Sequence, residues 1–285
     1  MNRHLFITDL DGTLLNDDKD ISGTDLETLV RLQSRGVVVA IATGRSLYSF
    51  QKALAAKKLE KDMLPVDYLL FSTGAGILDL KQNKILRNSA ISRPDVIKIT
   101  TCFDRAGFDY MVHKAIPDTH FFFYKSQGHE NPDFNKRIDL YQSFASPLHT
   151  ESEVYASATQ VLAVVPQGLV PGQLAELKSA LAGYSVIQAT SPLDHRSVWI
   201  EVFHHQTSKS QAAAWLASEL KIPRTRVVAV GNDYNDQDML EWAGQSFCVA
   251  NAASDLGTGV LMPVSNNAHG VSRAAGMSGL LKAKS

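Results

Sequence analysis

Phe6-Ile7-Thr8-Asp9-Leu10-Asp11-Gly12-Thr13 is the stretch of this chain that decides its fold. The apolar residues at 5–7 predict a buried strand, which delivers two carboxylates to its C-terminal end. Gly12 permits a backbone turn that a side chain would obstruct. Asp9 and Asp11 are two residues apart, so on a continuing strand their side chains share one face. Two acids on one face repel each other unless a cation or a shared proton relieves them, and reactive carboxylates arise in this way.

We take Asp9 as a candidate nucleophile toward phosphorus, with Asp11 as its acid/base partner beside a magnesium ion. Considered alone, the segment is equally compatible with a strand that ends in an Asp-Gly turn with solvated acids, because short motifs recur by chance. The rest of the chain has to decide between these two interpretations.

The composition indicates an ordinary globular protein. At 285 residues the chain is long enough for one large domain or two of ordinary size. Hydrophobic residues make up 45% and charged residues 20% of the chain, which is a folded rather than a disordered balance. The formal net charge is −1, so there is no basic field to bind nucleic acid or an anionic membrane. Any anionic ligand must therefore be held by a local site.

The two cysteines and the hydropathy pattern predict a soluble, cytoplasmic protein. Cys102 and Cys248 lie far apart in apolar surroundings, which favours buried free thiols in a reducing cytosol over a disulfide. The N-terminal apolar run is interrupted by Asp9 and Asp11, so it does not have the pattern of a signal peptide. No segment approaches the ~18 apolar residues of a membrane-spanning helix.

Strands and helices alternate in the first part of the chain. Buried strands are predicted at residues 37–42 and 67–72, with a helix over about 22–36 (N-cap Ser22 or Thr24) and another from about residue 46. Residues 77–87 predict a hairpin around Gln82-Asn83. This alternation indicates an α/β fold with a Rossmann-like, doubly wound parallel sheet. Ligands in such sheets bind beyond the carboxyl ends of the strands.

The middle of the chain changes character. Residues 92–193 mix predicted helices (94–106 and 171–181) with scattered strands (110–112, 121–124, 161–165 and 186–189), which indicates an inserted α+β domain. The aromatic run Phe121-Phe122-Phe123-Tyr124 could form a ligand platform, but a buried strand is the more common explanation. The parallel pattern is expected to resume with a strand at 198–203, a helix at 208–220 and strands at 226–230 and 247–250. The predicted domains are thus a core of residues 1–90 plus 194–285 and an insertion of residues 91–193.

Thr43-Gly44-Arg45 closes the second predicted strand and opens a helix. A hydroxyl group and backbone N–H groups at such a place suit a phosphate oxygen, because the helix dipole favours negative charge there. An ordinary helix N-cap at Thr43 is the alternative.

Lys209 falls at the start of a predicted helix, in Gln206-Thr207-Ser208-Lys209-Ser210. The helix dipole disfavours a cation at this end, so an anion beside Lys209 would explain its position. A solvated surface lysine is the alternative.

Gly231-Asn232-Asp233-Tyr234-Asn235-Asp236 follows a buried strand. Three closely spaced side chains with oxygen ligands would fit Mg²⁺. A turn rich in Asn and Asp before a helix is the alternative.

In this order the four motifs resemble the haloacid dehalogenase superfamily of phosphatases, and the resemblance covers nearly the whole chain. The late position of Lys209 and the large insertion before it resemble the class IIB, Cof-type branch, which hydrolyses sugar phosphates and similar metabolites. The segment Met262-Pro263-Val264-Ser265-Asn266-Asn267-Ala268-His269-Gly270-Val271 is similar to the one that usually follows the last strand. The four motifs together favour the catalytic interpretation of Asp9 and Asp11.

The resemblance implies roles for individual residues. Asp9 would be the nucleophile that forms an aspartyl-phosphate, and Asp11 would protonate the leaving alcohol and then activate water. Thr43, Gly44 and Lys209 would hold the phosphoryl oxygens.

The implied magnesium ion would be held by Asp9, the backbone carbonyl of Asp11 and the acidic loop, with Asn232 and Asp236 as the assigned loop ligands. The family pattern has an aspartate where this chain has Asn232. An amide can coordinate through its oxygen but brings no charge, so Asn232, Asp233 and Asp236 all stay candidates for completing the site.

Two further expectations concern substrate recognition. Thr73 stands where many relatives carry asparagine, which puts a substrate contact there in doubt. The inserted domain would be an α+β cap that closes over the site and selects the leaving group. Asp194, His195 and Arg196 lie where the chain is expected to return to the core. They would line the entrance or form a polar hinge.

The sequence thus predicts a Mg²⁺-dependent phosphatase that acts on a phosphorylated sugar, sugar acid or similar small metabolite through an aspartyl-phosphate. The alternatives are a phosphosugar mutase of the same fold and a receiver-like phospho-switch. Small phosphorylated molecules are the expected partners, and nucleic acid and membranes are not.

Overall fold

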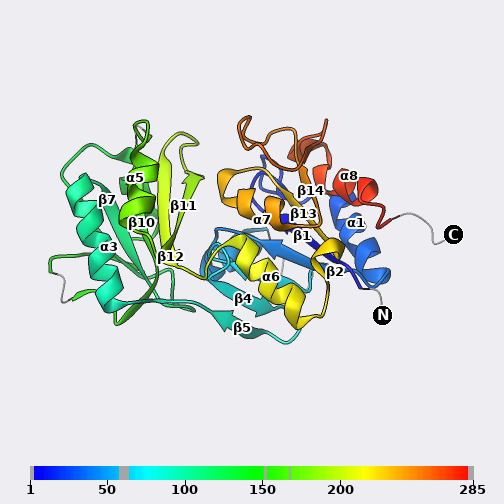
Figure 1. Ribbon diagram of the computed structural model, residues 1–285, viewed down its shortest axis with the longest axis horizontal. Coiled ribbons are helices and arrows are strands. Elements are labelled where there is room, and N and C mark those ends of the chain that lie inside the picture. Colours follow the sequence, from blue (N-terminus) through cyan, green and yellow to red (C-terminus); the bar gives the residue numbers. More distant parts are fainter. Residues whose placement is uncertain (1–2, 58–63, 151–152, 167, 282–285) are drawn as a thin grey trace. The chain divides into compact units, whose positions relative to one another are not determined.

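The computed structural model describes residues 3–57, 64–150, 153–166 and 168–281, which divide into two compact units (Figure 1). The first unit consists of the chain up to Arg45, Ser49–Arg87 and the chain from Ser208. The second unit contains Ser46–Tyr48 and Asn88–Thr207. The core is therefore built from segments on both sides of an inserted domain.

The first unit is organised around a sheet with the strand order β15-β14-β13-β1-β2-β3-β4-β5. The strands are β1 (Leu5–Asp9), β2 (Val38–Ala42), β3 (Tyr68–Phe71), β4 (Gly76–Asp79), β5 (Lys84–Asn88), β13 (Val227–Gly231), β14 (Gln245–Cys248) and β15 (Val260–Leu261). Neighbours from β15 to β3 pair in parallel, and β4 pairs antiparallel with β3. The predicted parallel α/β sheet and the hairpin over 77–87 are confirmed.

Helices cover both faces of this sheet. They are α1 (Gly23–Ser34), α2 (Leu47–Ala56), α6 (Lys209–Glu219), α7 (Gln237–Trp242) and α8 (Gly270–Met277), with 3₁₀ turns at Arg224–Arg226, Tyr234–Asp236 and Asn266–Ala268. Crossovers between parallel strands are right-handed. The step from β1 to β2 moves toward one edge of the sheet, and the step from β13 to β14 moves toward the other edge. The connecting helices α1 and α7 therefore lie on opposite faces of the sheet. The α6 and α7 helices pack on the face that carries Leu5 and Ile7, and α1 packs against α8.

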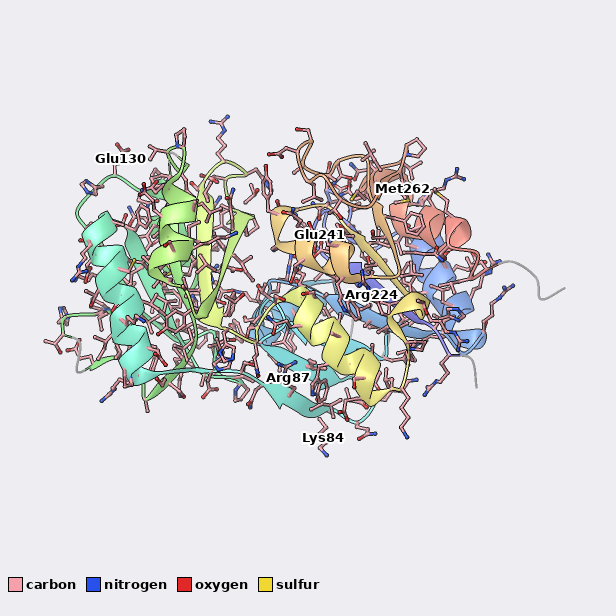
Figure 2. The ribbon with its side chains drawn as sticks, in the orientation of Figure 1. Lys84, Arg87, Glu130, Arg224, Glu241 and Met262 are labelled. Carbon is pink, nitrogen blue, oxygen red and sulfur yellow. The ribbon has the colours of Figure 1, made fainter. Side chains whose placement is uncertain are left out.

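Several side chains fix where these helices begin and end. The Ser22 hydroxyl accepts a hydrogen bond from the backbone N–H of Asp25 at 3.0 Å, which confirms Ser22 as the N-cap of α1. Arg224 donates to the carbonyl of Glu241 near the end of α7 at 3.1 Å, where the helix dipole favours a cation. Arg87, which is labelled in Figure 2, is part of β5, and its guanidinium group lies 5.9 Å from the centre of the Trp215 ring of α6. The last two contacts tie α7 to the turn before β13 and α6 to the edge strand β5.

The second unit is an α+β domain, as predicted. Its sheet has the order β11-β12-β10-β7-β8-β9, with β6 paired to β10. The strands are β6 (Ile91–Ser92), β7 (Asp109–Lys114), β8 (Phe122–Lys125), β9 (Ala145–Pro147), β10 (Ser157–Val165), β11 (Tyr184–Thr190) and β12 (Val198–His204), and the helices are α3 (Arg93–Ala106), α4 (Pro132–Leu140) and α5 (Gln173–Ala180). Three residues of the aromatic run, Phe122, Phe123 and Tyr124, lie on β8, where Phe122 is fully buried, whereas Phe121 precedes the strand and is exposed. The sequence did not predict α4, which begins at the Asn131 N-cap.

The prediction that the strand at 198–203 resumes the parallel sheet is wrong. This strand, β12, pairs antiparallel with β10 and β11 in the second unit. A continuous apolar run predicts burial but does not reveal which sheet buries it. The chain therefore leaves the second unit after Thr207. Asp194 belongs to a turn inside that unit, where its carboxylate accepts from Ser197 Oγ at 2.6 Å and from the backbone of Arg196 at 2.9 Å.

Both cysteines are free, with Cys248 buried and Cys102 half-buried. No helix among the described residues combines the length and the apolarity needed to cross a bilayer.

Replacement of Gly76 tests the packing at the start of β4. A Cβ atom there would lie 2.2–2.6 Å from the ring of Phe71, which is fully buried. Gly76→Ala should therefore lower the free energy of unfolding by about 1–3 kcal/mol, as overpacked cores do. Chemical denaturation measures the effect.

Gly276→Ala on α8 is the matched control. A Cβ atom there would meet no described atom within 4 Å, so the variant should gain about 0.5–1 kcal/mol from the better helix former. Equal stability of the two variants would contradict the packing argument.

Candidate active site

The candidate site lies where the strand order of the first unit reverses direction. β1 pairs with β2 on one side and with β13 on the other, all in parallel. Their carboxyl ends therefore meet at one edge of the sheet. Asp9 ends β1, Thr43 follows the end of β2, and Asn232 follows the end of β13. The topology thus gathers three of the four motifs, and α6 contributes the fourth.

Lys209 is the first residue of α6 and is fully buried. Its ammonium group donates to Asp9 Oδ1 at 2.7 Å, to Asp236 Oδ1 at 2.5 Å and to Asn235 Oδ1 at 3.1 Å. The alternative of a solvated surface lysine is wrong. The anions that explain a lysine at this helix terminus include two carboxylates of the protein itself.

The charges around Lys209 do not balance, because two buried carboxylates share one ammonium group. Burial raises the pKa of Asp9 to about 7; Asp236 adds to this shift, while Lys209 opposes it. Burial works against the charged form of Lys209, but Asp236 and Asp9 outweigh it and raise the pKa of Lys209 above its ordinary value. A buried surplus of negative charge of this kind favours a bound cation.

The side-chain amide of Asn232 completes a cluster of polar atoms around Asp9. One amide atom lies 3.1 Å from the backbone carbonyl oxygen of Asp11, 3.2 Å from Asp9 Oδ2 and 2.9 Å from Thr13 Oγ1. If the amide nitrogen occupies this place, it donates to the Asp11 carbonyl oxygen and to Asp9 Oδ2. The amide oxygen in this place accepts from Thr13 Oγ1 at 2.9 Å and lies beside two further oxygen atoms, an arrangement that a cation can stabilise. Gly12 leaves room for Asn232, because a Cβ atom at Gly12 would lie 2.7 Å from its amide nitrogen.

Asp236 is buried at the end of the same loop and uses both carboxylate oxygens within the protein. Oδ1 accepts from Lys209, and Oδ2 accepts from the backbone N–H groups of Asn232 at 2.9 Å and Asp233 at 3.1 Å. This carboxylate holds the loop and the lysine in place. Among the described residues, no three His, Cys, Asp or Glu side chains gather as a metal site. The oxygen cluster at Asp9 instead draws on an amide and a backbone carbonyl.

Arg45 holds Asp11, a contact that the sequence analysis missed. Arg45 Nε donates to Asp11 Oδ2 at 2.7 Å, and Nη2 donates to Oδ1 at 2.6 Å. Both side chains are partly exposed. The position of Arg45 in the Thr43-Gly44-Arg45 motif could have predicted this contact, because it places a cation at the same edge of the sheet as Asp11. A bidentate arginine fixes the orientation of a carboxylate as well as its position.

Thr43 and Thr73 lie at the edge of the site. Thr43 is buried, and its hydroxyl accepts from the backbone N–H of Arg45 at 3.1 Å. Thr73 Oγ1 would lie 3.7 Å from a Cβ atom at Gly44, so the two motifs are neighbours. Ser72 and Thr73 have φ values of +48° and +55°, and non-glycine residues in this region cluster at functional sites.

Comparisons with known proteins bear on the family of this chain. A family model described as haloacid dehalogenase-like hydrolase matches residues 6–274. The 5-amino-6-(5-phospho-D-ribitylamino)uracil phosphatase YitU of Bacillus subtilis is 26% identical over 261 residues, which cover 87% of each protein.

Solved structures show the same fold. A phosphatase of this superfamily from Bacteroides thetaiotaomicron has a TM-score of 0.75 at 19% identity, with 97% of this chain and 95% of that chain covered. A subclass IIB sugar phosphatase has a TM-score of 0.73 at 16% identity, with coverage of 97% and 99%. With the family model matched over residues 6–274, the chain belongs to the haloacid dehalogenase-like hydrolases, and it has the subclass IIB fold that its sequence predicts.

Proposed function

We propose that this protein is a Mg²⁺-dependent phosphatase that hydrolyses the phosphate monoester of a small metabolite through an aspartyl-phosphate on Asp9. The observation that carries the proposal is the cluster of Asp9 Oδ2, the Asp11 carbonyl oxygen and the Asn232 amide within 3.2 Å. Membership of the family and the phosphatase names of relatives such as YitU support the same reaction class.

The residues at the cluster fit a magnesium ion. Asp9 Oδ2, the carbonyl oxygen of Asp11 and the Asn232 side-chain oxygen would hold it, since Mg²⁺ takes hard oxygen ligands and keeps several waters. When bound, the ion would reduce the electrostatic repulsion between a carboxylate nucleophile and a phosphate dianion. The surplus negative charge around Lys209 adds a second reason for a cation there.

In the first proposed step Asp9 attacks phosphorus while the bond from phosphorus to the leaving oxygen breaks, and Asp11 gives a proton to that oxygen. In the second step water attacks the phosphorus, Asp11 takes the proton from the water, and the bond to Asp9 breaks to release phosphate. Lys209 contacts Asp9 directly at 2.7 Å, so it orients the nucleophile and lies close to the phosphoryl oxygens. Thr43 and Gly44 would bind those oxygens from the end of β2.

Arg45 is a positioning residue in this scheme. Its bidentate contact keeps the Asp11 carboxylate beside the nucleophile. The guanidinium group occupies both oxygens of Asp11, so Arg45 has to release at least one of them before Asp11 can exchange a proton with the leaving oxygen or with water. The phosphate group of the substrate is the anion suited to draw Arg45 away.

The substrate class is proposed to be a phosphorylated sugar, sugar acid or similar metabolite. One structural relative is a sugar phosphatase and one sequence relative acts on a phosphoribitylamino-uracil. Both of those leaving groups are polyhydroxylated. A panel of hexose phosphates, sugar-acid phosphates and ribityl phosphates, incubated with Mg²⁺, tests the proposal. Release of inorganic phosphate supports a phosphatase, whereas isomer formation without release indicates a mutase.

Asp9→Asn tests the nucleophile. We expect phosphate release from an aryl phosphate to fall by at least about a thousandfold, because an amide cannot attack phosphorus. The melting temperature should not fall, since Lys209 keeps the carboxylate of Asp236 as its partner. Asp18 is exposed in the loop that follows β1. Asp18→Asn is therefore the control and should retain activity. Full activity of Asp9→Asn would overturn the assignment.

Asn232→Asp tests the loop ligand. Without metal, a new carboxylate 3.2 Å from Asp9 Oδ2 should destabilise the protein by about 1–2 kcal/mol through like-charge repulsion. With metal, the added charge should tighten Mg²⁺ binding on the order of tenfold. Thermal unfolding in EDTA and in a magnesium titration measures both effects.

Asn135→Asp on α4 makes the same chemical change at an exposed position of the second unit. It should leave both the stability in EDTA and the magnesium midpoint as they are. Identical magnesium midpoints for Asn232→Asp and Asn135→Asp would show that Asn232 is not a ligand.

A further inference from the structure

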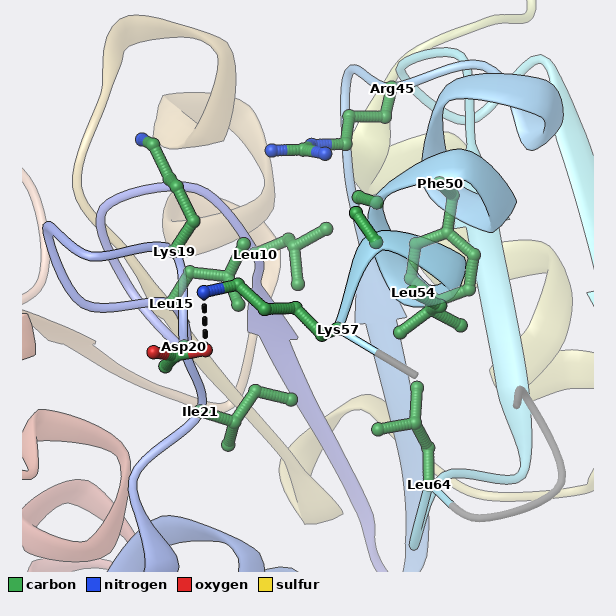
Figure 3. Close-up of a pocket in the computed structure, with 12 residues that line it drawn as sticks. Leu10, Leu15, Lys19, Asp20, Ile21, Arg45, Phe50, Leu54, Lys57 and Leu64 are labelled. Atoms are coloured by element: carbon green, nitrogen blue, oxygen red, sulfur yellow. Dashed lines mark ion pairs between the residues drawn. The ribbon is translucent and has the colours of Figure 1, made fainter. Parts of the chain in front are cut away.

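A cavity in the first unit lies beside the site, and of the side chains that line it only Arg45 takes part in the proposed chemistry. It is a cavity of about 190 Å³ between the segment that follows β1 and helix α2 (Figure 3). Its apolar walls are formed by buried side chains, among them Leu10, Leu15, Phe50, Leu54 and Leu64. Leu10 is the residue between the two catalytic aspartates, so the cavity reaches the back of the nucleophile segment.

The apolar lining selects the kind of group that can fill the cavity. Engineered cavities of roughly 150 Å³ with Leu, Ile and Phe walls stay dry and bind benzene. A cavity of about 190 Å³ thus has room for one aromatic ring or a hydrocarbon chain of roughly six to eight carbons. Phe50 and Leu54, one helical turn apart on α2, present adjacent surfaces to such a group.

Cationic side chains line the same cavity. Figure 3 shows Lys19 and Arg45 with their nitrogen atoms toward the same end, above Leu10 in this view. Asp20 and Lys57 also line the cavity, but they form an ion pair at 2.7 Å and so neutralise each other. Arg45 at the other end is already paired with Asp11 at 2.6 Å, so the additional positive charge that a ligand meets there is that of the exposed Lys19.

We propose that this cavity is a binding site for a small amphiphilic anion, a medium-chain or single-ring carboxylate. The hydrocarbon part lies among the leucines and Phe50, and the carboxylate pairs with Arg45 and Lys19. Each part matches a different portion of the lining. An apolar molecule without charge would leave the cations unused, and a small inorganic anion would leave the apolar walls unfilled.

Arg45 links this site to the catalytic aspartates. It contacts Asp11 through two nitrogens, at 2.7 and 2.6 Å, and it also lines the cavity. A carboxylate at the cationic end therefore competes with Asp11 for the same guanidinium group. Binding itself does not depend on the proposed hydrolysis, so it can be tested without any substrate.

Calorimetric titration of the full chain with butyrate, hexanoate and octanoate tests the apolar part. Affinity should rise about fourfold for each added methylene, which is the gain from burying one such group. Hexanol lacks the charge and should bind about tenfold more weakly than hexanoate, because it loses a charge-assisted contact. Arg45→Met should lower the affinity for hexanoate part of the way toward that for hexanol, because Lys19 then remains as the carboxylate's cationic partner.

A pair of variants on α2 locates the binding. Ala53 lines the cavity, whereas Ala55 is exposed on the same helix and does not. Ala53→Met fills the space and should abolish octanoate binding, while Ala55→Met should bind octanoate as the unchanged protein does. Thermal unfolding checks that both variants fold. If Ala53→Met does not fold, the chain-length series on the unchanged protein tests the proposal instead.

Three results would overturn the proposal. One is the absence of saturable binding by any of the carboxylates. Another is an affinity that does not depend on chain length. The third is equal octanoate binding by Ala53→Met and Ala55→Met.

Discussion

The structure of the site depends on one buried ammonium group shared by two carboxylates. Lys209 begins α6, Asp9 ends β1, and Asp236 follows β13, so the three elements must all be in place for the charges to meet. Lys209 and Asp9 are 200 residues apart in the chain. Loss of the Lys209 ammonium group would leave two buried carboxylates without their shared partner, and uncompensated buried charge of this kind destabilises a protein by about 3–5 kcal/mol, whereas loss of the Asp9 charge leaves Lys209 paired with Asp236. This interaction therefore joins the two parts of the core across the inserted domain.

The sheet topology explains why such an insertion is compatible with a precise site. β1 lies between β2, which comes before the insertion, and β13, which comes after it. The backbone ladders on both sides of β1 fix Asp9 against Ala42 and Thr8 against Val230. The carboxyl ends of these strands thus carry every proposed catalytic group except Lys209. The chain can leave after β5 and return before α6 without disturbing those ladders.

Much of this could be predicted from the sequence, because the relevant signals are local. The apolar runs at β1, β2 and β13, and the polar residues directly after them, indicate both the parallel sheet and the sheet edge where the site lies. The position of Lys209 against the helix dipole indicated a nearby anion. The errors concern partners that only the folded chain brings together. The apolar run of β12 fits either sheet, and the contact of Arg45 with Asp11 spans 34 positions of sequence.

Asparagine at position 232 follows from the same electrostatic constraint. Asp9 and Asp236 already share one ammonium group, and burial raises the pKa of Asp9 to about 7. A third carboxylate 3.2 Å from Asp9 Oδ2 would add repulsion to a pair of carboxylates that already shares one ammonium group. An amide avoids that repulsion, because its nitrogen can donate to Asp9 and to the Asp11 carbonyl. Rotation of the same amide turns its oxygen toward a cation. Asn232 therefore suits both the metal-free site and the proposed metal-bound site, where its neutral amide would hold a cation less tightly than a carboxylate would.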